Sequence, residues 1–364
     1  MSTTTGTAAT TTTGSRPRGT RRLDSTALIY LVLVVVVVGS AVLTAVEGRN
    51  FFTQGNIWAV LTAMSVLGLI AIGQTLVILV GSLDLSVPYV VSLATLVAAG
   101  GMKGLDSNVP AAVFNTLALC ALIGLAMGLL VSLLDVHGFI ASLGVGLLVS
   151  GYLATNYQGS FGAAAPNVRL LGRSGIAGII PTAFVILLVC AALVTLMLRY
   201  TRLGHHLYAV GGNREVARMS GVRTAVPVIA AHVLCSLLAG VAALLLLSRT
   251  GVGLPTIGSQ GRYDLLSIAA VVLGGTLLAG GKGSVIGTIG GVAIFAVIDN
   301  VMGVMQVNPF LKDFVRGLVI VLAVAVYARR SVVRRPPRFG PDHVLPLPAP
   351  LLASSSAPTD QDPA

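Results

Sequence analysis

Ten apolar segments, most of them 19 to 25 residues long, dominate this sequence. A helix of about 20 apolar residues spans the hydrocarbon core of a bilayer and satisfies its own backbone hydrogen bonds there. Only 10% of the residues are charged, against about 25% in soluble domains. The sequence therefore predicts an all-α, polytopic membrane protein with about ten transmembrane helices, some of them short or broken. The predicted spans are residues 27–46, 56–80, 85–100, 110–134, 139–157, 178–198, 226–247, 264–279, 284–305 and 310–328.

The distribution of positive charge predicts the orientation of these spans, because Lys and Arg near span ends are retained in the cytoplasm. With both chain ends inside, fifteen of the 23 Lys and Arg residues fall on cytoplasmic segments. The chain then divides into a disordered basic cytoplasmic tail (1–26), a transmembrane domain (27–328) and a basic, then Pro/Ser-rich cytoplasmic tail (329–364). The net charge of +11 is accordingly attributed to orientation and lipid head groups, and not to nucleic-acid binding.

The polar segment 199–225 is the longest interruption between apolar segments, and it carries five arginines. Its charge alone would make it a topology signal. Its internal order predicts more: a turn at 211–212, a short helix over 215–219 with Asn213 as N-cap, and Gly221 as the residue that closes the helix. A short capped helix at the cytoplasmic face would suit the docking of a cytoplasmic partner.

Two of the predicted spans, 85–100 and 264–279, are short, and each adjoins a glycine-rich polar corner, 81–86 and 280–284. Short, glycine-interrupted segments in corresponding halves of a transporter point to its transport path. Close helix packing is the alternative explanation for the glycines.

Several kinds of chemistry have no support in the sequence. The stretch 275–283 lacks a nucleotide-binding phosphate loop, because Thr276 stands where the first glycine is required and Gly283 follows Lys282. There is no spacing typical of a catalytic triad or a metal site, and His232 is interpreted as a satisfied interior polar group. The cysteines all fall inside apolar segments and predict neither a disulfide framework nor a metal site: Cys120, Cys190 and Cys235.

Charged residues inside apolar segments are functional candidates, because burying a charge in a membrane is costly. Asp84 and Asp264 lie near predicted span ends. Asp299 and Arg316 are predicted to form an ion pair near the outer ends of the last two spans. Such a pair would serve structure and function equally well.

Four motifs, 73–87, 138–144, 208–222 and 261–288, the last followed by Asp299-Asn300, resemble the ribose-type permease family. Its members are the transmembrane subunits of bacterial ATP-binding-cassette sugar importers. The resemblance implies a ten-helix permease in the bacterial cytoplasmic membrane that pairs with a second permease copy, two cytoplasmic ATPase subunits and an extracytoplasmic sugar-binding protein. It also implies that this chain has no cofactor, since ATP and Mg²⁺ bind to the partner ATPase.

The resemblance also implies a coupling element that contacts the ATPase, and it matches Gly211, Gly212, Asn213, Glu215, Ala217 and Gly221. If the chain is such a permease, its substrate path is expected to use polar groups that include Gln74, Asp84, Ser86, Tyr263, Asp264 and Asn300. The chain departs from the family pattern after Tyr263, where one acidic residue is missing, and at Val216, residues 136–138 and Asp299. These departures leave the transported molecule open.

The favoured hypothesis is a non-catalytic permease subunit for a monosaccharide such as ribose, xylose or galactose. A nucleoside permease of the same architecture is one alternative. An ion-driven transporter is another, and it would need buried titratable groups in the middle of its spans. An intramembrane enzyme is disfavoured because no nucleophile and base are paired in the sequence.

Overall fold

The computed structural model describes residues 25–176 and 178–332, and most of them are helical. The predicted tails therefore lie almost wholly outside the described residues. Residues up to Tyr327 form one unit, and the packing below concerns that unit. The elements are α1 (Ser25–Val46), α2 (Gln54–Leu79), α3 (Val87–Met102), η1 (Asp106–Asn108), α4 (Val109–Leu133), α5 (Gly138–Asn156), α6 (Pro166–Arg173), β1 (Gly175–Ile176), β2 (Ile180–Pro181), α7 (Thr182–Tyr200), α8 (Arg202–Gly212), α9 (Arg214–Met219), α10 (Ala225–Thr250), α11 (Ile257–Gln260), α12 (Tyr263–Leu273), α13 (Val285–Val304) and α14 (Pro309–Val332).

Each of the ten predicted spans overlaps a helix of the structure. Among the described residues, seven helices are long and apolar enough to cross a membrane, and α3 and α12 are shorter apolar helices. The prediction of an all-α, multi-pass membrane protein is confirmed. The count of ten membrane crossings stays a prediction, because α3, α12 and α14 do not meet the length and composition of a full span.

Helix α12 ends six residues before the predicted end of its span. Gly274 caps it and Gly275 follows with a φ of +86°, a left-handed conformation that other residues adopt at a cost. No helix forms again until Val285. The predicted span over 264–279 is therefore a short helix followed by irregular backbone, which at membrane depth must be buried in protein or line a polar cavity.

The centre of the unit is the contact between α10 and the α2, α3 and α4 helices. Small residues let these backbones approach closely. A side chain at Gly124 of α4 would come within 2.6 Å of the His232 carbonyl oxygen, and one at Gly73 of α2 within 2.9 Å of the Cys235 Cα atom. The outer helices instead expose large aliphatic side chains, such as Val35 of α1 and Leu148 of α5, as expected for surfaces that face lipid.

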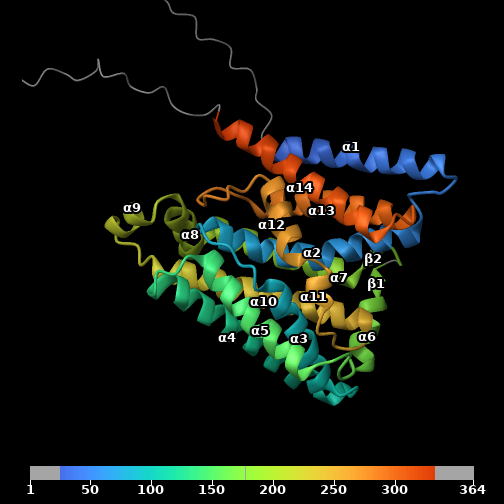
Figure 1. Ribbon diagram of the computed structural model, residues 1–364, viewed down its shortest axis with the longest axis horizontal. Helices are drawn as coiled ribbons and strands as arrows, with labels where there is room; N and C mark the ends of the chain where they lie inside the picture. The colour runs from blue at the N-terminus through green and yellow to red at the C-terminus, as the bar shows by residue number, and fades with distance from the viewer. Residues whose placement is uncertain (1–24, 177, 333–364) are drawn as a thin grey trace, which may run out of the picture. The chain divides into compact units, whose positions relative to one another are not determined.

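Contacts between loops divide them into two sets at opposite ends of the bundle (Figure 1). One set surrounds α9 and comprises residues 79–86, 132–138, 208–214 and 276–284, which contact one another. We call this the α9 end. The other set surrounds α6 and comprises residues 47–54, 99–108, 157–176, 178–181, 249–262 and 303–313. We call this the α6 end. Successive long helices run from one end to the other, as the predicted topology requires.

Candidate coupling helix and transport path

The predicted docking helix is present as α9. Asn213 has extended backbone, and its side-chain oxygen accepts hydrogen bonds from the N–H groups of Glu215 and Val216, both at 3.0 Å. Gly221 follows the helix with a φ of +83°, as a closing residue does. The local prediction of cap, helix and closing glycine is confirmed.

The predicted turn at Gly211–Gly212 is wrong, since both residues belong to the last turn of α8. Gly211 is required for another reason: a side chain there would overlap the Leu79 carbonyl oxygen and approach the nitrogen of Gly281 to 2.6 Å. The Gly281 N–H donates to the same Leu79 carbonyl at 3.0 Å. The two glycine-rich corners of the sequence and the end of α8 therefore meet backbone to backbone. Gly280 completes this junction, because a side chain there would lie 2.9 Å from both the Gly211 oxygen and the Gly81 nitrogen.

The outward face of α9 is apolar at two positions. Met219 is 81% exposed and Val216 57% exposed, whereas Ala217 is buried beneath them. Glu215 forms an exposed ion pair with Arg218 at 2.9 Å. A short helix that presents two apolar side chains beside a charge pair has the composition of a protein-docking surface.

Arg214, which was not among the predicted site residues, anchors α9 to the rest of the unit. Its guanidinium donates to the Asp135 carboxylate at 2.8 Å and to the Ser132 carbonyl at 3.2 Å, both next to the α4–α5 connection. The sequence signal was weak, because one arginine among five in a basic loop has nothing to distinguish it.

Three predicted path residues come together at the corner between α2 and α3, and all three are fully buried. The Asp84 carboxylate accepts from the Ser86 N–H at 2.9 Å and from its hydroxyl at 2.6 Å through the same oxygen, Oδ1. With its amide NH₂ turned toward the Asp84 carbonyl, Gln74 both donates to that carbonyl and accepts from the Asp84 N–H, each at 3.2 Å. The corner, which has no helix, is thus held by side chains on both of its flanks.

His232 of α10 belongs to this corner, although it was not among the predicted site residues. Its Nε2 atom lies 3.2 Å from the Ser82 hydroxyl, and its Nδ1 atom lies 3.8 Å from Asp84 Oδ2. Neither Nδ1 nor Oδ2 has a hydrogen-bond partner among the described residues. The interpretation of His232 as a satisfied polar group is therefore wrong for one of its two nitrogens. The rule that ionisable residues in apolar segments are functional candidates could have found it.

The other three predicted path residues lie toward the α6 end. Tyr263 and Asp264 begin α12, and Asn300 lies near the end of α13. Among the described residues, no side-chain hydrogen bond or ion pair joins them to Gln74, Asp84 or Ser86, so the structure divides the six predicted residues between two places. The Asn300 side-chain oxygen is buried without a hydrogen-bond partner among the described residues.

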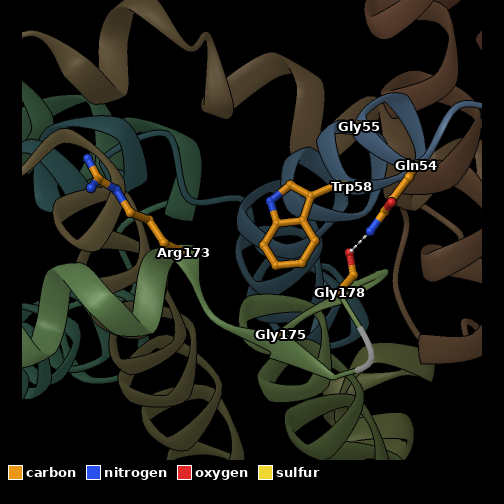
Figure 2. A pocket seen from close by; sticks show the side chains of 6 residues that line it. All are labelled: Gln54, Gly55, Trp58, Arg173, Gly175 and Gly178. Carbon is orange, nitrogen blue, oxygen red and sulfur yellow. Dashed lines mark hydrogen bonds between the residues drawn. The ribbon is translucent and has the colours of Figure 1, made fainter.

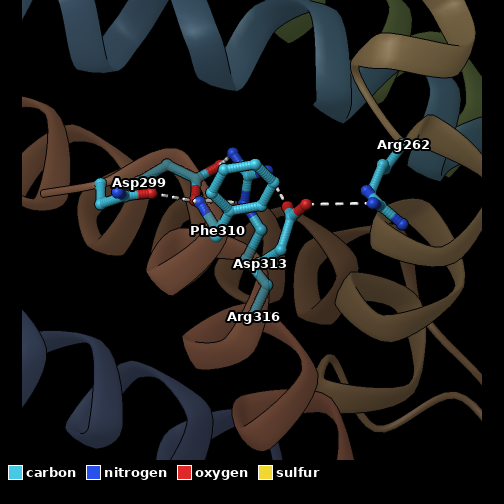
Figure 3. A network of polar contacts seen from close by, with 6 residues as sticks. Arg262, Asp299, Phe310, Asp313 and Arg316 are labelled. Carbon is cyan, nitrogen blue, oxygen red and sulfur yellow. Dashed lines mark hydrogen bonds and ion pairs between the residues drawn. The ribbon is translucent and has the colours of Figure 1, made fainter.

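The predicted ion pair is confirmed in this second place. Arg316 of α14 binds both carboxylate oxygens of Asp299, at 2.8 and 2.9 Å. Asp313 continues the network to Arg316 at 3.2 Å and to Arg262 at 3.0 Å (Figure 3). A polar cavity of about 390 Å³ adjoins it, lined by Ser259, Gln260, Arg262, Pro309, Lys312, Asp313 and Arg316.

Two further cavities occupy opposite ends. At the α6 end, a cavity of about 510 Å³ lies beside the Trp58 indole, between Arg173 and Gln54, whose amide donates to the Gly178 carbonyl at 2.8 Å (Figure 2). At the α9 end, a cavity of about 270 Å³ is lined by Val80, Gly81, Ser82, Val131, Asp135, Val136, His137, Gly138, Arg214 and Val228. Within residues 25–176 and 178–332, no three His, Cys, Asp or Glu side chains are grouped to hold a metal ion.

Comparison with known proteins identifies relatives that match most of the chain. The chain is 36% identical over 308 residues to the ribose import permease protein RbsC of Escherichia coli K12, covering 84% of this chain and 93% of the relative. It is 31% identical to RbsC of Bacillus subtilis, with 80% and 90% covered. It is 30% identical to the galactose/methyl galactoside import permease protein MglC of Haemophilus influenzae, with 83% and 95% covered. No solved structure matches.

A family model described as the permease component of branched-chain amino acid transport systems matches residues 56–324. This range contains the buried corner, α9 and the Asp299–Arg316 pair. The chain belongs to this family of transport-system permease components.

Proposed function

We propose that this chain is the membrane-spanning subunit of an ATP-driven importer for a monosaccharide of the ribose, xylose or galactose type. The identity of 36% to a ribose import permease over 84% of the chain carries the proposal. Relatives named for galactose and methyl galactoside support a sugar over other cargo. The chain itself catalyses no covalent step, and its partners supply the energy.

In this proposal, α9 docks into a cytoplasmic ATPase. Met219 and Val216 supply the apolar contact and the Glu215–Arg218 pair borders it. Arg214 and the glycine junction then pass movement of α9 to the α2–α3 corner. A second permease copy completes the path, and an extracytoplasmic binding protein delivers the sugar at the α6 end, where the polar cavity beside Arg262 lies.

The energy source distinguishes this function from the ion-driven alternative. The permease, its ATPase and its binding protein are reconstituted in vesicles, and uptake of labelled ribose and galactose is measured. Uptake is expected to stop with vanadate and to continue with a protonophore while ATP is maintained. Uptake that resists vanadate and stops with the protonophore would overturn the importer function.

The cargo is tested in the same vesicles by competition. Ribose, xylose and galactose are expected to compete with one another for uptake. Competition by a nucleoside alone would favour the nucleoside alternative. Competition by leucine alone would favour the branched-chain amino acids for which the family is named.

The proposed orientation places the α9 end and both chain ends in the cytoplasm of a bacterial cell, with the α6 end outside. It is supported by the basic residues around α9. A cysteine introduced at Ser160, an exposed residue of the α6 end, is expected to react with a membrane-impermeant thiol reagent in intact cells. A cysteine at Ser220, the exposed cap of α9, is expected to react only after the membrane is opened. The reverse pattern would invert the topology.

A further inference from the structure

Asp84 and His232 are buried neighbours, and the two facing atoms, Asp84 Oδ2 and His232 Nδ1, have no hydrogen-bond partner among the described residues. The Oδ1 atom of Asp84 is engaged by Ser86, while its Oδ2 atom faces the Nδ1 atom of His232 across 3.8 Å. That separation is too long for a hydrogen bond. Both side chains are completely buried, where an unpaired polar atom costs more than it does at a surface. A small displacement of either residue would close the gap.

The imidazole already has a competing partner on its other side. His232 Nε2 lies 3.2 Å from the Ser82 hydroxyl, and Ser82 also lines the 270 Å³ cavity at the α9 end. Ser82 therefore stands between the imidazole and that cavity. The other ionisable groups around the pair are the Cys235 thiol in the interior and the Asp135, His137 and Arg214 side chains on the cavity wall.

Both residues of the pair are connected to α9, but by different routes. His232 lies on α10, which begins six residues after α9 ends and continues as one helix past His232. Asp84 is held to α2 by Gln74, and α2 meets α8 where Gly211 packs on the Leu79 carbonyl. A movement of α9 that shifts α10 along α2 therefore changes the distance between His232 and Asp84.

We propose that His232 is a positioning residue of the transport cycle that exchanges partners between Ser82 and Asp84. In the state described here, the imidazole of His232 is hydrogen-bonded to the Ser82 hydroxyl. When the ATPase moves α9, the imidazole closes on Asp84 and releases Ser82, and the corner opens toward the cavity. Two packed arrangements of one element, each with its own hydrogen bond, are the usual basis of a conformational switch. This inference rests on the proposed function, because it requires an ATPase at α9.

The test measures sugar transported per ATP hydrolysed by the reconstituted complex. His232→Gln and Asp84→Asn are each expected to lower this ratio at least tenfold while the ATPase still co-purifies. The double variant is expected to recover part of the ratio, since two amides can bond to each other and leave no unpaired charge. A merely structural role would lower the amount of protein and leave the ratio unchanged, and that result would overturn the inference.

Two different outcomes of this experiment would overturn the proposed function and the inference. If the wild-type complex hydrolyses ATP without moving any of the sugars tested, the importer function is wrong and the inference falls with it. If the wild-type complex transports normally and the His232→Gln ratio is also normal, only the inference is wrong.

A second measurement covers the case in which the His232 variants do not fold. Val228 lines the cavity one helical turn before His232 and is buried. A Val228→Cys reporter in an otherwise unchanged chain is exposed to a thiol reagent at the α9 end, with the parent chain as control. Labelling is expected to accelerate at least threefold when ATP and vanadate trap the moved state. Equal labelling in both states would overturn the inference.

Discussion

At the α9 end, Gln74, Asp84 and His232 are completely buried, and glycine contacts fix the backbone around them. At the α6 end, Asp299 and Arg316 keep about a quarter of their side-chain surface exposed, and Asp313 keeps 39%. The first region is held by packing and by buried hydrogen bonds, including those to the Asp84 carboxylate, which salt screens little. The second is held by ion pairs near solvent, which salt weakens. Polar residues of one chain can thus be positioned by close packing in one place and by ion pairs in another.

The largest loss is expected where packing leaves no room. Gly211→Val adds a side chain against the Leu79 carbonyl and Gly281, and overpacking of this kind costs about 1–3 kcal/mol or more. Folded protein in the membrane is expected to fall strongly, as measured by detergent-solubilised yield and thermal unfolding. Gly212→Ala is the matched control, because a Cβ at Gly212 meets no atom within 4 Å. Equal losses in both variants would show that the glycine junction does not determine stability.

Local features of the α9 end could be predicted from the sequence, but its junction could not. The Asn213 cap and Gly221 follow from neighbouring residues, so the short helix was found. The contact of Gly211 with Leu79 joins segments more than 130 residues apart in the sequence, and nothing in either segment marks the other. The contact of His232 with Asp84 was missed for the same physical reason.

The α6 end was more predictable, because its central pair lies on successive helices. Asp299 and Arg316 are 17 residues apart across one tight connection, so two opposite charges in facing apolar segments had few other partners. Arg262 and Asp313 were not predicted as a pair. Both lie near the starts of helices, where the sequence pattern does not indicate which way a side chain points. The end of α12 was placed too late because the apolar pattern continues past Gly274 and Gly275, where the backbone leaves the helix.

An intermediate loss is expected at the Asp299–Arg316 pair. Asp299→Asn or Arg316→Gln leaves the other charge half-buried with fewer partners, and hydrogen bonds to charged groups are worth about 1.5–3 kcal/mol. Thermal unfolding of each single variant is expected to occur at lower temperature than that of the parent. The double variant is expected to recover part of the loss, because neither charge is left alone.

The same stability losses should depend differently on salt concentration at the two ends. High salt is expected to reduce the difference between parent and single variants at the α6 end, and to leave the effect of Gly211→Val unchanged. Additive losses of stability in the Asp299 and Arg316 variants would mean that the two residues do not interact. The α6 end would then not be held by this ion pair.

The smallest effects on stability are expected at two exposed ion pairs, one at each end. Glu215 pairs with Arg218 on α9, and Arg262 pairs with Asp313 beside the polar cavity. Exposed pairs contribute about 0–1 kcal/mol, so Glu215→Lys and Arg262→Gln should both leave folded yield near that of the parent.

The two variants should differ in partner binding, because Glu215 borders the apolar face of α9 proposed to dock the ATPase, whereas Arg262 lies at the opposite end. Glu215→Lys is therefore expected to reduce ATPase co-purification and transport several-fold, with Arg262→Gln and Thr224→Ala as controls that keep the ATPase bound. If Glu215→Lys retains both the ATPase and normal transport, Glu215 contributes nothing to docking, and the proposed docking surface would have to rest on Val216 and Met219 alone.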